Sequence, residues 1–176
     1  MRPASFYHAG HASWGVVNGD VIFDAGAVLF RTLPTLKSLL ATQSFSALPS
    51  ALRKAPRLAL NDIKWLLVIP APGKILCVGV NYEEHRQETG RAVVAYPTLF
   101  ARYASSQTGH LHDILRPKSS VELDFEGELA VIIGHAGHYI QGRDAIAHIA
   151  GFACYNDVTV RDFQRHTSQF TPRQKF

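Results

Sequence analysis

Three carboxylates alternate along one short segment of this chain and are the first candidates for chemistry. Asp124, Glu126 and Glu128 stand two residues apart in the segment VELDFEGELAVIIG. Alternate residues of a β-strand point to the same face, so the three side chains would lie about 6–7 Å apart and repel one another. A hard divalent cation would relieve that repulsion, because Mg²⁺, Mn²⁺ and Ca²⁺ all take carboxylate oxygens as ligands. A solvated outer face of the strand is the alternative interpretation.

A fourth carboxylate follows the next apolar run. Asp157 ends the segment FACYND, which we expect to form a buried strand after a helical crossover. A carboxylate at a strand end is well placed for a functional site. Taken alone, however, an Asp at such a position also serves as a turn or cap residue.

His85 and Glu88 form a second candidate group, in the polar segment NYEEHRQETG. Residues three apart share a helical face, so a helix here would bring the imidazole and the carboxylate together. A carboxylate beside an imidazole holds its tautomer and raises its basicity, which suits general-base activation of water. An exposed ion pair on a charged helix is the other interpretation of this spacing.

The other histidine pairs lack the partners that a zinc site needs. No cysteine or second histidine pair stands at the spacing of a zinc finger, so we interpret these histidines as surface or loop residues. The pairs are His8 with His11, His110 with His112, and His135 with His138. A Gly-rich phosphate loop and a G-x-S-x-G nucleophile elbow are also missing from the sequence.

The elements that must position these residues belong to two parts of the chain. Residues 1–65 read as a small α+β domain, with a hairpin whose turn we expect at Asn18-Gly19 as type I′. Leucines at helical spacing follow in the segment TLPTLKSLLAT. After a Pro/Gly boundary at Val68–Lys74, the character changes to short strands.

Residues 66–176 read as a strand-rich domain, so the predicted fold class is α+β, mainly β. We expect buried strands at KILCVGV and FACYND, a further strand at YPTLF, and a strand at VELDFEGELAVIIG whose second half is buried. GRDAIAHIAG predicts a short helix capped by Asp144. These segments all come from the printed sequence.

The charge pattern argues against nucleic acid as a partner. The chain of 176 residues has a net charge of +4, with 47% hydrophobic and 18% charged residues, which is the composition of an ordinary globular protein. Its basic residues are scattered, and no basic run carries the interleaved aromatic residues of a stacking platform.

Neither a membrane nor an export route is expected. No apolar run reaches the ~18 residues of a membrane span, and the first residues have no apolar signal-peptide core. Cys77 and Cys154 lie in apolar runs, so we expect buried thiols in a reducing compartment. These features predict a cytoplasmic protein.

Four segments occur in the order found in the fumarylacetoacetate hydrolase superfamily, which residues 66–176 resemble. They are KILCVGVNYEEH, YPTLF, DFEGELAVIIG and AGFACYNDVTVRDFQ. The E-x-E strand followed by N-D-x-x-x-R-D is specific as a set. The resemblance implies a mixed β-roll of the family's type, preceded by the small N-terminal domain of many bacterial members.

The resemblance also implies roles for individual residues. Glu126, Glu128 and Asp157 match the carboxylates that bind a divalent metal, with Mg²⁺ expected first and Mn²⁺ or Ca²⁺ as alternatives. His85 and Glu88 match the catalytic pair. Two further positions, Gln164 and Lys175, are expected to contact substrate, although Lys175 stands one place later than the family's lysine. Asp124 is not a ligand in the family pattern.

The implied function is a metal-dependent hydrolase that cleaves a C–C bond in a 2-oxo or 1,3-diketo acid resembling fumarylacetoacetate or an acylpyruvate, in aromatic or small-acid catabolism. An isomerase, decarboxylase or hydratase using the same enolate-type chemistry is the alternative. Family members are often homodimers, so we expect a homodimer here.

The sequence ends at Phe176, before the point at which the family's catalytic domain normally ends. A one-base frameshift in the coding DNA would explain both this end and the tail TPRQKF, which stands where relatives read T-P-G-K-N-F. We therefore expect an incomplete roll with unpaired strand edges. An inactive remnant that folds only through dimerisation is the hypothesis from another class.

Overall fold

The computed structural model describes residues 1–88 and 90–167. These residues divide into two compact units, each discontinuous in sequence. The first unit comprises Met1–Pro70, Thr108–Ile114 and Gly127–Asn156, and the remaining segments form the second unit. The predicted domain boundary at residue 65 stays a prediction, because residues on both sides of it share the first unit with two later segments.

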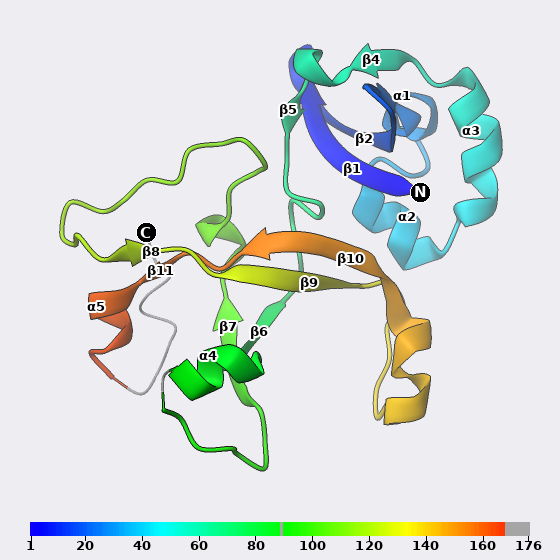
Figure 1. Cartoon of the computed structure of the whole chain (residues 1–176). Helices are drawn as coiled ribbons and strands as arrows, with labels where there is room; N and C mark the ends of the chain where they lie inside the picture. The colour runs from blue at the N-terminus through cyan, green and yellow to red at the C-terminus, as the bar shows by residue number, and fades with distance from the viewer. Residues whose placement is uncertain (89, 168–176) are drawn as a thin grey trace. The chain divides into compact units, whose positions relative to one another are not determined.

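An antiparallel sheet dominates the first 65 residues, with strand order β4-β3-β2-β1-β5 (Figure 1). Its long strands β1 and β2 pair along their full lengths, from Arg2↔Val17 to His8↔His11. The strands are β1 (Arg2–His8), β2 (His11–Asn18), β3 (Val21–Phe23), β4 (Arg57–Ala59) and β5 (Lys64–Trp65).

The predicted hairpin between β2 and β3 forms, but its turn type differs from the prediction. Asn18 pairs with Val21, so the two-residue loop is Gly19-Asp20. Gly19 has φ +59°, whereas Asp20 is not among the residues with positive φ. A positive φ at the first loop residue alone matches type II′, for which glycine at that position carries no steric penalty.

Short helices cover this sheet and supply its core. Thr35 caps α2, with its hydroxyl accepting from the Ser38 backbone and the Ser38 hydroxyl accepting from the Thr35 backbone. The leucines of the predicted helical pattern pack with Trp14, whose indole N–H donates to the Leu33 carbonyl at 2.8 Å. The helices are α1 (Ala25–Leu29), α2 (Leu36–Thr42), η1 (Phe45–Ala47), α3 (Leu48–Lys54) and η2 (Leu60–Asp62).

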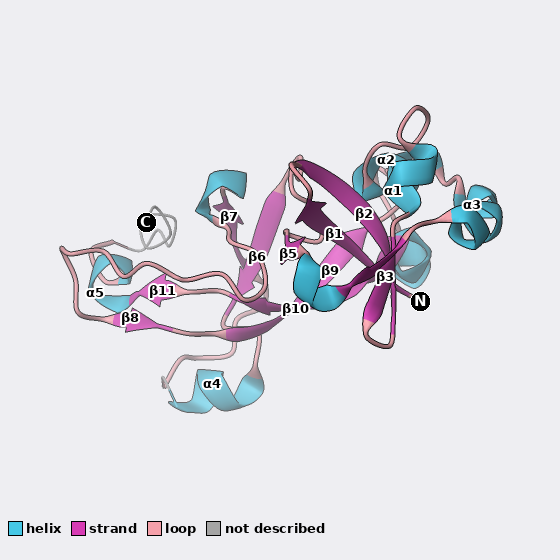
Figure 2. Cartoon of the chain, turned by 90° about the horizontal axis from the view of Figure 1, so that it is seen from above, coloured by secondary structure: helices cyan, strands magenta, loops and turns pink. Residues whose placement is uncertain are grey.

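The segment Gly127–Asn156 of the first unit forms a long two-stranded ribbon (Figure 1; both strands are also labelled in Figure 2), made by β9 (Gly127–Ile133) and β10 (Ile149–Asn156). The predicted burial of its apolar residues is wrong. Val131 and Phe152 face one another across the ribbon and are 46% and 57% exposed. Only alternate residues are half-buried, so one apolar face of the ribbon lies open.

The predicted helix before β10 is a 3-10 helix, η4 (Gly142–His148). It begins after Gln141, and no side chain caps its first turn, so the expected Asp144 cap does not form. Asp144 instead lies 3.7 Å from Arg143, in an exposed ion pair.

The described part of the second unit contains two short antiparallel pairs, two α-helices and one 3-10 helix. β6 pairs with β7, and β8 pairs with β11. The expected burial of β6 is wrong, because Leu76 is 66% exposed. The elements are β6 (Ile75–Gly79), α4 (Glu83–Glu88), β7 (Thr98–Arg102), η3 (Ala104–Ser106), β8 (Leu123–Asp124), β11 (Thr159–Val160) and α5 (Arg161–Gln164).

The strand-rich α+β class is confirmed. The expectation of two buried thiols is wrong for Cys154, which is exposed, and Cys77 is only half-buried. Across the described residues, no helix combines the length and the apolar character that crossing a membrane requires.

Candidate functional site

The predicted carboxylates of the second unit, Asp124, Glu126 and Asp157, lie in or directly beside the paired strands β8 and β11. Asp124 pairs with Thr159, the Arg161 amide donates to the Glu122 carbonyl, and the Asp157 amide donates to the Glu126 carbonyl, the last two at 2.9 Å. Residues that alternate along paired strands share a face. The register therefore sets the acidic side chains of one strand beside Asp157 and Arg161 of the other.

Arg161 bridges two of these carboxylates. Its Nε and Nη2 both lie 2.8 Å from Asp124 Oδ2, and its Nη1 donates to Glu126 Oε1 at 2.5 Å. The side chains of Arg161 and Glu126 are 22% and 17% exposed. Because water has limited access, this charge-assisted pair is stronger than an ordinary surface salt bridge.

The bridge changes the acidity of Asp124. The hydrogen bond from Arg161 lowers the pKa of Asp124 below its usual value, and smaller effects of the same sign come from the Phe125 amide, from the charge of Arg161 and from an electrostatic interaction with His85. Both α4, which carries His85, and β8 belong to the second unit.

Asp157 is held by a second arginine. Arg102, the last residue of β7, donates through Nη1 to Asp157 Oδ1 and through Nη2 to the Val158 carbonyl at 3.2 Å. Both side chains of the pair are 5% exposed. A buried carboxylate is stable as an ion only when it is paired and hydrogen-bonded, and this pair meets that condition.

The predicted His85–Glu88 pair lies on the predicted helix, α4. The His85 Nδ1 and Glu88 Oε2 atoms are 3.9 Å apart, which is beyond hydrogen-bond length, and the side chains are 47% and 77% exposed. The Glu83 carboxylate stabilises the same helix by accepting hydrogen bonds from the side chains of Arg86 and Gln87. The Arg86 hydrogen bond chiefly lowers the pKa of Glu83 to about 2.

The remaining predicted residues fall in different places. Gln164 ends α5, and its Oε1 accepts from Arg161 Nη1 at 3.2 Å. Glu128 is half-buried on β9 opposite Tyr155, in the first unit. Lys175 and the tail TPRQKF lie outside the described residues.

The chemistry of the predicted metal ligands suits a hard cation, because all three are carboxylates. Within residues 1–88 and 90–167, however, no three side chains of His, Cys, Asp or Glu converge in a way that could hold a metal ion. Glu126 and Asp157 each contact a guanidinium instead. The carboxylate ligands therefore suit a divalent metal by type. In this structure, however, two of the three, Glu126 and Asp157, form ion pairs with arginine.

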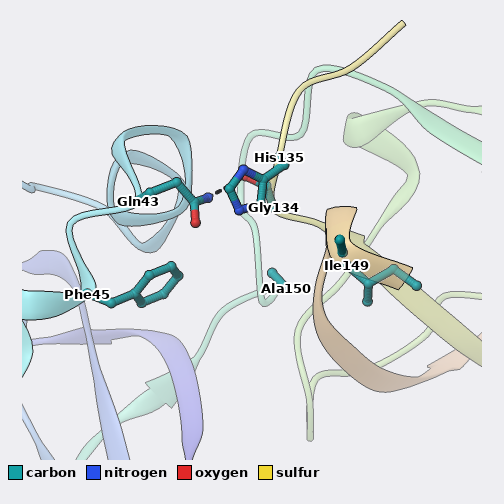
Figure 3. A pocket seen from close by; sticks show the side chains of 7 residues that line it. Gln43, Phe45, Gly134, His135, Ile149 and Ala150 are labelled. Atoms are coloured by element: carbon teal, nitrogen blue, oxygen red, sulfur yellow. Dashed lines mark hydrogen bonds between the residues drawn. The ribbon is translucent and has the colours of Figure 1, made fainter. Parts of the chain in front are cut away.

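A separate hollow of about 250 Å³ lies in the first unit (Figure 3). The Gln43 amide points across it and donates to the Gly134 carbonyl at 2.7 Å. Its other lining residues are Phe45, His135, Ala147, Ile149 and Ala150. None of the predicted site residues lines this hollow.

The sequence does not predict the two arginines of the site, Arg161 and Arg102, and the family pattern leaves Asp124 out of the metal ligands. Arg161 had a signal, since it is the arginine of the N-D-x-x-x-R-D pattern. Arg102 had none, because 55 residues separate it from Asp157 and only folding brings them together.

Comparison with known families gives a match over more than half of the chain. The model of the fumarylacetoacetate (FAA) hydrolase C-terminal family matches residues 74–176. A curated relative is oxaloacetate tautomerase FAHD2A, mitochondrial, of Bos taurus, which is 38% identical over 152 residues. That alignment covers 84% of this chain and 48% of the relative, so the chain spans about half the length of the curated relatives it matches.

Solved structures give the same family. Fumarylacetoacetate hydrolase from Exiguobacterium antarcticum matches all of this chain and 62% of its own, with a TM-score of 0.84 and 30% identity. Maleylpyruvate hydrolase from Sphingobium sp. SYK-6, in complex with manganese(II) and pyruvate, has a TM-score of 0.74 and 27% identity over 92% of this chain and 60% of its own. The predicted family and its fold are thereby confirmed.

Proposed function

The chain belongs to the fumarylacetoacetate hydrolase family, and on this premise we propose that it carries the metal-binding and acid–base residues of an enzyme acting on a small 2-oxo acid. The observation that supports this most directly is the link through Arg161. That side chain contacts Glu126, Asp124 and Gln164. A proposed metal ligand and a proposed substrate-binding residue thus share one contact.

The proposed metal ligands are Glu126, Glu128 and Asp157. A divalent cation held there, Mg²⁺ first, would supply Lewis-acid polarisation of the oxo and carboxylate oxygens of the substrate. The manganese and pyruvate in the Sphingobium maleylpyruvate hydrolase support a divalent ion and a 2-oxo acid as ligands. Mn²⁺ and Ca²⁺ stay alternatives.

His85 is the proposed base. Glu88 Oε2 lies 3.9 Å from His85 Nδ1, so a small rotation of either side chain would form a hydrogen bond between them. That bond would keep the proton of the neutral imidazole on Nδ1 and leave Nε2 free to accept a proton from the substrate. Catalytic hydrogen bonds are often long before substrate binds. Gln164 would orient the substrate, because its amide nitrogen can donate to a carboxylate oxygen.

We propose keto–enol interconversion as the reaction. His85 would take a proton from the carbon next to the oxo group, the electron pair would move onto the oxo oxygen, and that oxygen would then receive a proton. The 38% identity to an oxaloacetate tautomerase over 84% of this chain supports this choice.

Hydrolysis of a C–C bond is the second candidate. Here His85 would take a proton from water, and the resulting hydroxide would attack the remote carbonyl of a diketo acid before the C–C bond breaks. The likeness to the Exiguobacterium fumarylacetoacetate hydrolase supports it. A homodimer and a cytoplasmic location stay predictions, and the bovine relative is mitochondrial by its name.

Proton nuclear magnetic resonance in D₂O distinguishes the two reactions. The purified 176-residue chain with Mg²⁺ is incubated with oxaloacetate and, separately, with an acylpyruvate. We expect deuterium to enter the carbon next to the oxo group faster than in buffer, and we expect His85→Asn and Glu126→Gln each to remove this acceleration.

The outcomes separate the hypotheses. Release of pyruvate from the acylpyruvate would favour hydrolysis over tautomerisation. A folded chain that accelerates neither reaction would contradict activity of this chain by itself. The hypothesis of a non-catalytic chain that folds only with a second copy would then be favoured if the protein is a dimer at every concentration tested.

A further inference from the structure

Arg161 holds the carboxylate that the proposed metal would need. Its guanidinium lies between Asp124 and Glu126, with contacts of 2.8 Å and 2.5 Å. A guanidinium and a divalent cation seek the same oxygens, and the two positive charges repel one another at such short range. We propose that Arg161 and the divalent cation compete for Glu126, so that metal binding requires the guanidinium to leave this carboxylate.

The inference rests on the proposed function, because it takes Glu126 as a metal ligand. It goes further by assigning to the Arg161 guanidinium an effect on metal affinity: this positive charge weakens the binding of a divalent cation to Glu126. Asp124 has a part in this exchange as well. As the second carboxylate of the bridge it can keep Arg161 after Glu126 turns to the ion, since two of the guanidinium nitrogens already contact Asp124 Oδ2.

The backbone explains why Arg161 is placed there. Thr159 pairs with Asp124, and the Arg161 amide donates to the Glu122 carbonyl at 2.9 Å. Arg161 is therefore anchored at the first residue of α5, directly after a strand that is in register with the acidic strand. Its side chain is 22% exposed and also contacts Gln164, so it stays beside the carboxylates even when it releases Glu126.

Arg165 offers a matched control. It lies one turn further along the chain, and its ion pair with Glu122 is exposed, with side chains 64% and 43% exposed. Replacing either arginine by glutamine removes one positive charge from the same region. Only Arg161→Gln removes a group that contacts Glu126.

The experiment measures Mn²⁺ affinity by isothermal titration calorimetry, without any turnover. Wild type, Arg161→Gln, Arg161→Lys and Arg165→Gln are compared, and circular dichroism in EDTA checks that each is folded. We expect Arg161→Gln to bind Mn²⁺ at least about tenfold more tightly than wild type, because like charges no longer meet. Arg165→Gln is expected to stay within about twofold of wild type, since exposed charges are screened.

Arg161→Lys keeps the charge but loses the fork that bridges two carboxylates, so its affinity should lie between those of wild type and Arg161→Gln. It also carries the test if Arg161→Gln is unfolded. If wild type binds Mn²⁺ and the Arg161 variants bind no more tightly than Arg165→Gln, the competition is refuted while the metal site stands. If no folded variant binds Mn²⁺, the proposed metal site itself fails, and the competition fails with it.

Discussion

Arg102 and Asp157 form an ion pair that is almost completely enclosed, with each side chain 5% exposed. Fifty-five residues separate them in the chain. The pair fixes the end of β7 to the segment that leaves β10, because Arg102 also donates to the Val158 carbonyl. Asp157 is thus held at a defined place by an interaction whose loss would leave its carboxylate buried without the Arg102 guanidinium.

Arg102→Met should therefore lower the free energy of unfolding by about 3–5 kcal/mol, the usual cost of removing one partner of a buried pair. Urea unfolding followed by circular dichroism measures this change. Arg165→Gln breaks an exposed pair with Glu122 and should change the free energy by about 0.5 kcal/mol or less. Equal effects of the two substitutions would contradict the importance assigned to the buried pair.

The leucines of the chain should differ sharply in their importance for stability. Leu39 is 1% exposed in the core around Trp14, whereas Leu129 on β9 is 59% exposed. Leu39→Ala should destabilise the fold by about 2–5 kcal/mol through lost packing and a cavity. Leu129→Ala should change stability by about 0.5 kcal/mol or less. A comparable loss for both would show that the open face of β9 is covered in solution.

The ionisation of Glu83 is predicted to lie at unusually low pH. Arg86 holds its pKa at about 2, against an ordinary value of 4.5. A lowered carboxyl pKa means that the interaction stabilises the folded state above pH 4.5 and that this contribution is lost as the pH falls through about 2.

Carboxyl carbon chemical shifts measured by nuclear magnetic resonance against pH test this value. In Arg86→Gln the midpoint of Glu83 should rise toward 4.5, because the charged hydrogen bond is gone. Arg143→Gln, which disturbs the separate pair with Asp144, should leave it unchanged. A wild-type midpoint already near 4.5 would refute the pairing in solution.

The open apolar face of the β9–β10 ribbon should bind a hydrophobic dye. Val131 and Phe152 lie opposite one another on it and are largely exposed. Replacing both with threonine keeps strand propensity while removing apolar surface, so the fluorescence of anilinonaphthalene sulfonate should fall with little change in melting temperature.

A control for this dye experiment is Tyr7→Thr. Tyr7 is 41% exposed on β1, but it pairs with Ala12 and Lys64 rather than with large apolar residues. It should contribute little to dye binding. Equal losses of fluorescence in the two variants would show that dye binding does not report the ribbon face.

Local patterns in the sequence were sufficient to predict most of the elements. The β2–β3 hairpin, apart from its turn type, and the leucine-rich helix α2 follow from local spacing, because periodicity and loop residues act over a few positions. The predicted acidic strand is interrupted at Phe125 and Glu126 and forms two strands, β8 and β9, in different sheets. Spacing likewise placed Glu126 among alternating carboxylates, and put His85 and Glu88 on one helix. The family itself was visible in four short segments and is confirmed by the match over residues 74–176.

Tertiary structure decided which of these features are buried and with what they pair. The strands that carry Phe152 and Leu76 have the apolar composition of buried strands, but both side chains are exposed. Burial depends on whether another layer covers that face of the strand, and not on the strand itself. Arg102, at the end of β7, and Arg161, at the start of α5, reach Asp157 and Glu126 only because folding brings these segments together. Such contacts join residues far apart in the chain, and no local periodicity encodes them.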